Sequence, residues 1–178
     1  MKPILAGSIN REEVDSVWKI ARLNGLTTIN MSLGEVAAMS PTLTSRMVDA
    51  MPSLERVLRN AGFKALSRSG SRGVAKTDFT IAHGNISPHS DDNLGMAALV
   101  LLKVTPFCKS ESVSLTRSPW SNANFLWTNS GLMEMEENDV VVFNGDKEHA
   151  WFCDGRAHFV TVLVTKPRKR KGDTVEWS

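Results

Sequence analysis

The spacing of the apolar residues changes near residue 70, and this change constrains the fold more than any other feature of the chain. Before that point, apolar residues recur every three or four positions, which is typical of helices that bury one side. After it, short apolar or alternating runs are separated by Gly, Pro, Asn and Asp, which is typical of strands joined by turns. The pattern predicts packed helices first and then a β-sandwich or barrel.

Capping residues mark the ends of the predicted helices. Asn10 can cap a first helix that ends at Asn24-Gly25. A second helical stretch begins at Ser40-Pro41, is interrupted at Pro52 and ends at 60–62. One face of the first helix carries Val14, Val17, Trp18 and Ala21. We expect both stretches to be scaffold, because an apolar stripe normally means burial against a core.

The strand predictions rest on short runs between turn residues. They cover 27–31, 74–83, 96–104, 111–116, 125–127, 140–143, 150–152 and 157–164. Within the predicted strand 96–104, the run from Met96 to Leu102 is continuously apolar, as in a strand that is buried on both faces. The fold class expected from these patterns is α+β and mainly β.

Length and charge favour one folded unit with a charged end. The 178 residues suit a single domain, which we place at 1–165. Residues 166–178 form a basic, flexible tail in this interpretation, because 166–171 carries five positive charges. The tail either contacts nucleic acid or is a solvated terminus. No apolar run has the length of a signal peptide or membrane span, so the cytoplasm is the expected compartment.

Two histidines and one aspartate stand in contexts that suit a metal. In extended backbone, residues two positions apart point to the same side, so His89 and Asp91 can bind one ion. His149 follows an apolar strand and a polar turn further along the chain. Two His and one carboxylate form the facial triad of non-haem Fe(II) oxygenases, which leaves three coordination positions open. The sequence therefore predicts His89, Asp91 and His149 as metal ligands and catalytic residues.

A candidate anion clamp lies seven residues after His149. Arg156 begins the last predicted strand, and a guanidinium there can bind a carboxylate with two parallel hydrogen bonds. Strand alternation would place His158 on the same face as Arg156. We therefore expect Arg156, and after it His158, to point into the barrel beside the metal.

These motifs, in this order, resemble the Fe(II)/2-oxoglutarate-dependent dioxygenase superfamily. His-x-Asp is preceded by Gly84, the distal His149 follows a strand that ends in Phe143, and Arg156 begins the final core strand. The resemblance covers about 74–165. It implies a double-stranded β-helix, a jelly-roll or cupin-like core, with the N-terminal helices as a supporting layer.

The resemblance also implies a function. Fe(II) would bind His89, Asp91 and His149, and 2-oxoglutarate and O2 would be the co-substrates in the hydroxylation of a C–H bond. The far carboxylate of 2-oxoglutarate would bind Arg156, with His158 as the next candidate. The segment His89 to Asn93 is similar to the His-x-Asp-x-Asn of nucleobase hydroxylases. The loop with Arg68 and Arg72 agrees with a nucleobase substrate, while a protein side chain or a small molecule stays open.

Two other classes of protein stay open at this point. The segment 88–92, Pro-His-Ser-Asp-Asp, resembles a motif of zinc-dependent N-acetylglucosaminyl deacetylases, in which it opens an α/β domain. The later His-x-x-His of those hydrolases does not occur in this sequence. The same β-helix also occurs in cupin-like modules that bind a ligand without turnover.

Overall fold

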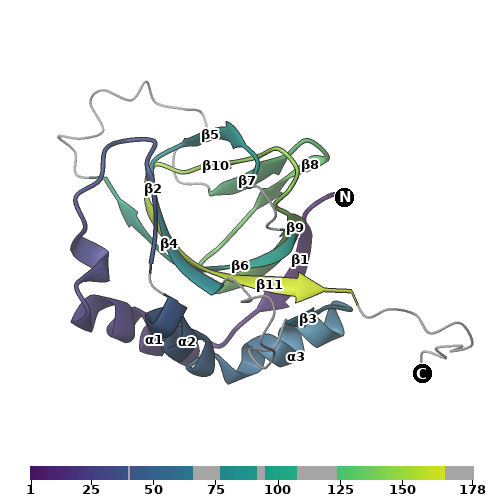
Figure 1. Ribbon diagram of the computed structural model, residues 1–178, viewed down its shortest axis with the longest axis horizontal. Coiled ribbons are helices and arrows are strands. Elements are labelled where there is room, and N and C mark those ends of the chain that lie inside the picture. The colour runs from purple at the N-terminus through teal and green to yellow at the C-terminus, as the bar shows by residue number, and fades with distance from the viewer. Residues whose placement is uncertain (40, 66–76, 92–94, 108–123, 167–178) are drawn as a thin grey trace, which may run out of the picture.

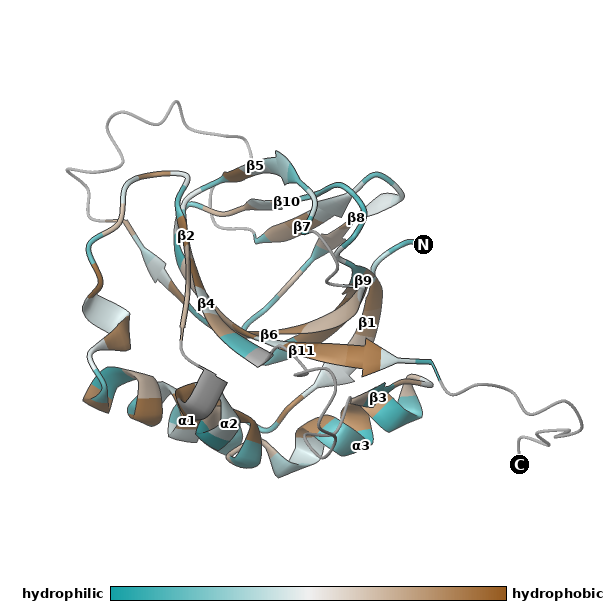
Figure 2. Cartoon of the chain, in the orientation of Figure 1, coloured by the Kyte–Doolittle hydropathy of each residue, from teal (hydrophilic) through white to brown (hydrophobic). Residues whose placement is uncertain are grey.

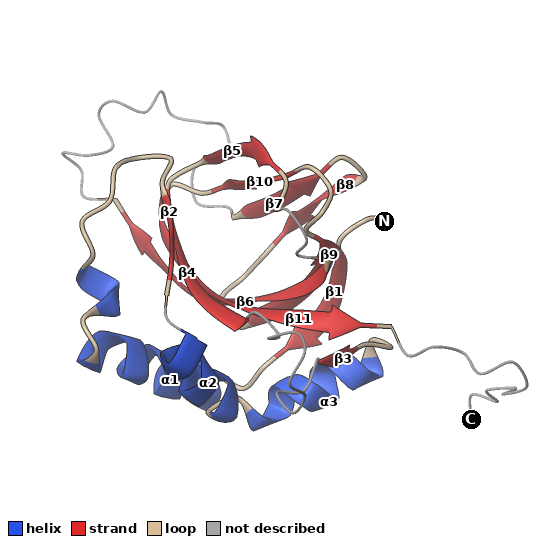
Figure 3. Ribbon diagram, viewed as in Figure 1, coloured by secondary structure: helices blue, strands red, loops and turns tan. Residues whose placement is uncertain are grey.

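A computed structural model describes residues 1–39, 41–65, 77–91, 95–107 and 124–166. Within them, three α-helices cover the outer face of the larger of two antiparallel sheets (Figure 1). The smaller sheet lies on the other side of the larger one (Figure 3). This is the α+β, mainly β architecture predicted from the sequence.

The helices begin and end where the sequence predicts. Helix α1 (Arg11–Leu23) follows Asn10, and α2 (Pro41–Asp49) and α3 (Pro52–Asn60) are separated just before Pro52. Gly25 adopts a left-handed conformation with φ of 69°, which ends α1. Helix α1 buries Val14, Val17 and Ala21 under the sheet.

Every strand pair in the described residues is antiparallel. The larger sheet has the order β1-β9-β6-β11-β4-β2, and β3 also pairs with β11. Its strands are β1 (Ile4–Ser8), β9 (Asp139–Asn144), β6 (Met96–Pro106), β11 (Gly155–Thr165), β4 (Thr77–His83), β2 (Val36–Ala38) and β3 (Lys64–Ala65). The smaller sheet has the order β5-β10-β7-β8. Its strands are β5 (Ile86–His89), β10 (His149–Phe152), β7 (Phe125–Thr128) and β8 (Gly131–Glu134).

Two apolar cores lie on opposite faces of the larger sheet. One face of β6 places Ala98, Val100 and Leu102 in the core shared with the helices. The other face places Ala97 and Leu101 in the core between the sheets. Figure 2 shows apolar stretches along β6, β9 and β11. The continuous apolar run is therefore buried on both faces, as predicted, and the larger sheet is held between the helical layer and the smaller sheet.

Some sequence expectations differ from the structure. Residues 27–31 were expected to form a strand, but Leu26–Thr28 is a turn of 3-10 helix (η1). The Thr28 hydroxyl donates to the Gly25 carbonyl at 3.2 Å, and this local bond competes with extended backbone. Short strands such as β2 and β5 were missed, because so few residues carry little periodicity. The predicted strand at 111–116, the arginine loop and the tail beyond Lys166 lie outside the described residues.

The antiparallel sheets also bear on the deacetylase alternative. That class requires an α/β domain opening at the segment 88–92, whereas the described residues around His89 belong to an antiparallel sheet.

None of the helices in the described ranges has the length and apolar character needed to cross a membrane.

Candidate metal centre

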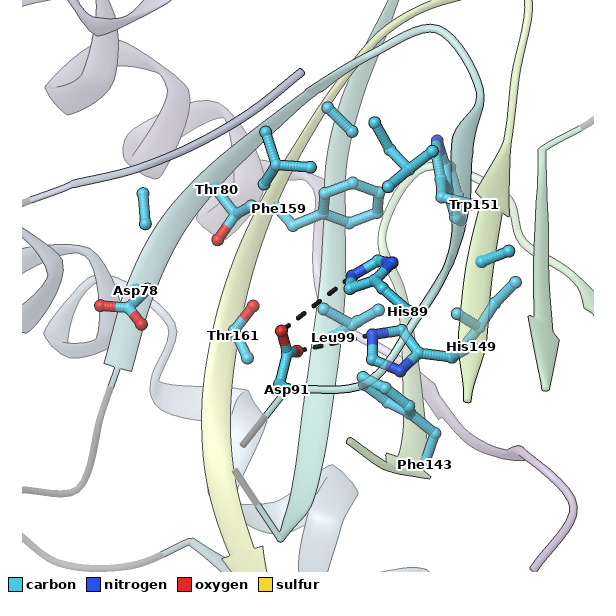
Figure 4. A pocket seen from close by; sticks show the side chains of 16 residues that line it. Asp78, Thr80, His89, Asp91, Leu99, Phe143, His149, Trp151, Phe159 and Thr161 are labelled. Atoms are coloured by element: carbon cyan, nitrogen blue, oxygen red, sulfur yellow. Dashed lines mark ion pairs between the residues drawn. The ribbon is translucent and has the colours of Figure 1, made fainter. Parts of the chain in front are cut away.

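His89 and His149 come together as cross-strand neighbours. Strands β5 and β10 pair antiparallel, and the register places His149 directly opposite His89. Directly opposed residues have side chains on the same face of the sheet. Their ring centroids are accordingly 4.4 Å apart, and the two rings lie next to each other among the lining side chains in Figure 4. Strand pairing thus joins two residues that are 60 positions apart in the sequence.

Backbone carbonyls fix which nitrogen of each ring carries the proton. The Nδ1 atom of His89 lies 2.8 Å from the Ser87 carbonyl oxygen, and that of His149 lies 2.9 Å from the Lys147 carbonyl oxygen. A carbonyl oxygen only accepts, so Nδ1–H is the donor in both rings, and in a neutral ring with this arrangement Nε2 carries the lone pair. This is the tautomer in which a histidine binds a metal through Nε2.

Asp91 faces both of these Nε2 atoms. Its carboxylate oxygens lie 3.5 Å from Nε2 of His149 and 4.0 Å from Nε2 of His89 (Figure 4). The backbone N–H of Asp91 donates to the Gly145 carbonyl at 2.9 Å, which holds the carboxylate beside the loop before β10. One ligand atom from each of the three residues lies within 4.8 Å of the others.

The donor set fits a divalent metal ion. When both rings are neutral, as metal binding requires, the two Nε2 lone pairs and the Asp91 carboxylate converge on one point. A divalent cation at that point would satisfy all three groups, and two imidazoles with one carboxylate suit Fe(II) with open positions. His149 is buried and packs against the Phe143 ring, whereas the side chain of His89 is 40% exposed. The candidate metal site is therefore anchored on one side and open to solvent on the other.

A cavity of about 400 Å³ adjoins the three residues. The side chains opposite His149 are Asp78 and Thr80 on β4 and Phe159 and Thr161 on β11 (Figure 4). The Trp151 ring meets the Phe159 ring edge to face at 4.6 Å. The remaining lining residues are mostly apolar: Val36, Ala38, Ala82, Ile86, Leu99, Leu126, Phe143 and Ala150. A small organic ligand can thus reach the candidate metal from between the two sheets.

Comparison with known proteins relates this arrangement to oxygenases through structure alone. The sequence matches no protein family and no curated protein. A prolyl-4-hydroxylase from Pseudomonas putida is similar over 93% of this chain and 92% of its own, with a TM-score of 0.50 and 11% identity. The non-haem monooxygenase ThoJ, without metal, is similar over 93% of this chain and 74% of its own, with a TM-score of 0.51 and 12% identity. A nickel complex of ThoJ gives a TM-score of 0.51, 11% identity and coverage of 93% and 73%.

The chain has the double-stranded β-helix fold of the Fe(II)/2-oxoglutarate-dependent dioxygenase superfamily. At the level of the fold, the resemblance predicted from the sequence is confirmed. In this fold, the candidate triad lines the cavity together with residues from both sheets.

Arg156 does not point into the β-helix, and the orientation expected for it is wrong. Its Nη1 donates to the Ile29 carbonyl at 3.0 Å, on the outer side of the larger sheet. Its cross-strand partner His83 makes a similar contact, with Nδ1 2.8 Å from the Met31 carbonyl oxygen. The two side chains therefore hold the segment 29–31 that leads to β2, and Arg156 does not line the cavity.

His158 lies on the same outer face and not at the mouth of the β-helix. It is 1% exposed, and its ring packs edge to face on Trp18 of α1 at 4.7 Å. Neither ring nitrogen has a hydrogen-bond partner. Burial above all, with smaller contributions from the charges of Arg156 and Lys103, lowers the pKa of His158 to about 4, while the Lys103 backbone acts in the opposite direction. His158 is a neutral core residue between the sheet and α1.

Both faces of β11 pack against apolar cores, which explains why strand alternation alone predicted the wrong face for Arg156 and His158. Val160 and Val162 pack toward the helices, and Ala157 and Phe159 pack toward the smaller sheet. Alternation shows which residues share a face but not which layer that face meets. The cavity residues Phe159 and Thr161 were missed because the sequence does not show that their face lines the cavity. Phe and Thr side chains also do not mark a site by their chemistry.

Replacing Arg156 with Ala should therefore leave ligand binding at the candidate metal site unchanged. The expected effect is on stability, a loss of about 1–2 kcal/mol, because one half-buried charged hydrogen bond is removed. Chemical denaturation measures the change in stability, and titration of the same variant with metal measures the metal affinity of the candidate site. A metal or co-substrate affinity that fell severalfold in a variant of normal stability would contradict this placement.

Proposed function

We propose that this chain is an Fe(II)-dependent oxygenase in which His89, Asp91 and His149 bind the metal. The observation that carries the proposal is the convergence of two Nε2 lone pairs and one carboxylate beside a ligand-sized cavity. The shared fold of the prolyl-4-hydroxylase and ThoJ supports the same assignment. Three protein ligands leave positions for a bidentate co-substrate and for O2.

A 2-oxo acid is the co-substrate class that we propose, and 2-oxoglutarate is its member expected from the sequence resemblance. The bound metal would supply redox chemistry in which one oxygen atom of O2 enters a C–H bond. The other oxygen atom enters the carboxylic acid left when the 2-oxo acid loses CO2, so atoms and electrons balance. His89, Asp91 and His149 would hold the metal, and the Phe159 and Trp151 rings would exclude water from the space beside it.

The substrate that receives oxygen stays a prediction. A nucleobase was expected from Asn93, the loop with Arg68 and Arg72, and the basic tail; of these, all but Lys166 at the start of the tail lie outside the described residues. A non-catalytic cupin-like module shares the fold, so turnover has to be measured directly.

The test is metal-dependent consumption of a 2-oxo acid. The full chain is loaded with Fe(II) without oxygen, mixed with a panel of 2-oxo acids and exposed to O2. We expect CO2 release that requires both Fe(II) and O2 with at least one of these acids. Tight Fe(II) binding without CO2 release from any of them would favour the binding module. Retention of zinc, with hydrolysis of an N-acetylated sugar, would favour the hydrolase.

A further inference from the structure

One short turn holds two of the three triad residues. Residues 145–148 connect β9 to β10 and lead directly into His149. The Gly145 carbonyl accepts the backbone N–H of Asp91 at 2.9 Å, and the Lys147 carbonyl oxygen lies 2.9 Å from Nδ1 of His149. The position of the Asp91 carboxylate relative to the His149 ring therefore depends on the shape of this turn.

The same turn is also bonded to Gly95, which follows Asp91 closely in the sequence. The N–H of Gly145 donates to the Gly95 carbonyl at 2.7 Å, and the N–H of Gly95 donates to Oδ1 of Asp146 at 2.8 Å. The chain that carries Asp91 is thus attached to the turn at Asp91 and again at Gly95. The Asp146 carboxylate supplies one of these bonds, and the other two join backbone groups.

Asn144 orders the backbone of Asp146. The Oδ1 atom of Asn144 accepts the N–H of Asp146 at 3.1 Å, and the Asn144 carbonyl accepts the N–H of Lys147 at 3.2 Å. Because the backbone of Asp146 is already fixed, less conformational entropy is lost when its side chain bonds to Gly95. A charged acceptor also makes that bond stronger than a neutral one. The contact between Asp146 and Gly95 is therefore suited to hold the two segments together.

We infer that Asp146 is a positioning residue of the metal centre, which fixes the Asp91 carboxylate through the bond to Gly95 without touching the metal. The inference rests on the proposed function, because it concerns a metal held by His89, Asp91 and His149. Asp146 is exposed and contributes no ligand atom to the cluster. Without its carboxylate, the partly exposed Gly95 N–H would bond to water, so the apolar cores would persist while Asp91 would be held less firmly.

Two variants of Asp146 separate the hydrogen bond from the charge. Asp146→Ala removes both, whereas Asp146→Asn removes the charge and keeps an oxygen that can accept the Gly95 N–H. Each variant, as the full chain, is titrated calorimetrically with Fe(II) under anaerobic conditions. We expect Asp146→Ala to bind Fe(II) about 10-fold more weakly than the parent, as for other groups that orient metal ligands. Asp146→Asn should stay within about 3-fold of the parent, because the bond to Gly95 still forms.

A spectroscopic measurement distinguishes positioning from a general loss of stability. Co(II) can replace Fe(II) in such a site, and its visible absorption bands depend on the number and geometry of its ligands. We expect altered bands in Asp146→Ala and parental bands in Asp146→Asn.

Glu137→Ala is the matched control. Glu137 is an exposed carboxylate that accepts the Val104 N–H at 2.9 Å, and it belongs neither to the cluster nor to the cavity wall. The control removes the same kind of bond, so it should lose a similar amount of stability. Its Fe(II) affinity and its Co(II) bands should equal those of the parent.

Asp146→Ser is the second variant, which decides the matter if Asp146→Ala does not fold. Serine is favoured in turns, but its hydroxyl is attached one atom closer to the backbone than Oδ1 and is too short for the bond to Gly95. Its Fe(II) affinity should also fall about 10-fold.

The outcomes separate this inference from the function beneath it. Parental Fe(II) affinity and parental Co(II) bands in Asp146→Ala or Asp146→Ser would overturn the role of Asp146 and leave the metal site standing. An equal loss of affinity in Asp146→Ala and Asp146→Asn would assign the effect to the charge, which also overturns the inference. Absence of Fe(II) binding by the parent would overturn the proposed function itself.

Discussion

The His149→Ala variant should bind Fe(II) at least about 100-fold more weakly than the parent and should lose all metal-dependent turnover. Changes to groups that merely orient a ligand already cost 10–100-fold in affinity, so loss of a ligand should cost more. Removing the ring takes away the buried Nε2, the member of the triad that lies closest to Asp91. The fold should survive, because β10 keeps its pairing with both neighbouring strands.

Glu148→Gln is the control for this variant. Glu148 is the exposed neighbour of His149 and contributes no ligand atom to the cluster. Calorimetric titration of Fe(II) under anaerobic conditions should give the parent affinity for Glu148→Gln. If His149→Ala bound Fe(II) as tightly as the parent, with an unchanged circular dichroism spectrum, His149 would not be a ligand.

Acidification should destabilise the protein through His158. The pKa of this buried ring is lowered to about 4 from an ordinary value of 6.5, so the folded state resists protonation. Above pH 6.5 the ring is neutral in both states, and its contribution to stability is complete. As the pH falls from 6.5 to 4, the unfolded chain takes up a proton that the folded chain does not. The free energy of unfolding should therefore fall by about 3 kcal/mol across this window.

A variant without the titrating ring isolates this effect from the other ionisable groups. His158→Leu keeps an apolar side chain between Trp18 and Phe79 and removes two ring nitrogens that have no partner. Its stability at pH 7 should be close to that of the parent, because no buried polar group is left unpaired. Urea denaturation from pH 7 to pH 4 should show a shallower decline for the variant. If the free energy of unfolding fell equally with pH in the two proteins, His158 would not be the cause of the pH dependence.

Much of the fold could be predicted because strong periodic segments decide their own structure. The apolar stripe on α1 favours a helix that is buried on one side. The apolar run in β6 favours a strand that is buried on both faces. Edge strands such as β2 and β5 owe their extended form to a partner strand, which local sequence does not reveal. The strand prediction for 27–31 was wrong for the opposite reason. The local hydrogen bond from the Thr28 hydroxyl to the Gly25 carbonyl outweighs the β propensity of the threonines.

The three residues that the structure brings together at the candidate site could be picked out from the sequence, whereas the walls of the cavity could not. His89 and Asp91 are two residues apart, and imidazole and carboxylate have few other reasons to recur around apolar strands. The wall depends instead on which face of β11 meets the helices. That choice is made by long-range packing of Trp18 and Phe79 on His158. A prediction of the cavity wall from charged residues alone includes Arg156, which does not line the cavity, and omits Thr161, which does.

Anomalous X-ray scattering from crystals soaked in Mn(II), a stand-in for Fe(II), tests the central claim most directly. The structure predicts one strong peak at about 2.0–2.2 Å from Nε2 of His89, Nε2 of His149 and a carboxylate oxygen of Asp91. The peak should vanish in crystals of the His149→Ala variant. A saturating soak that gives no peak between these three residues, or a strong peak elsewhere on the protein alone, would contradict the assignment of a metal centre.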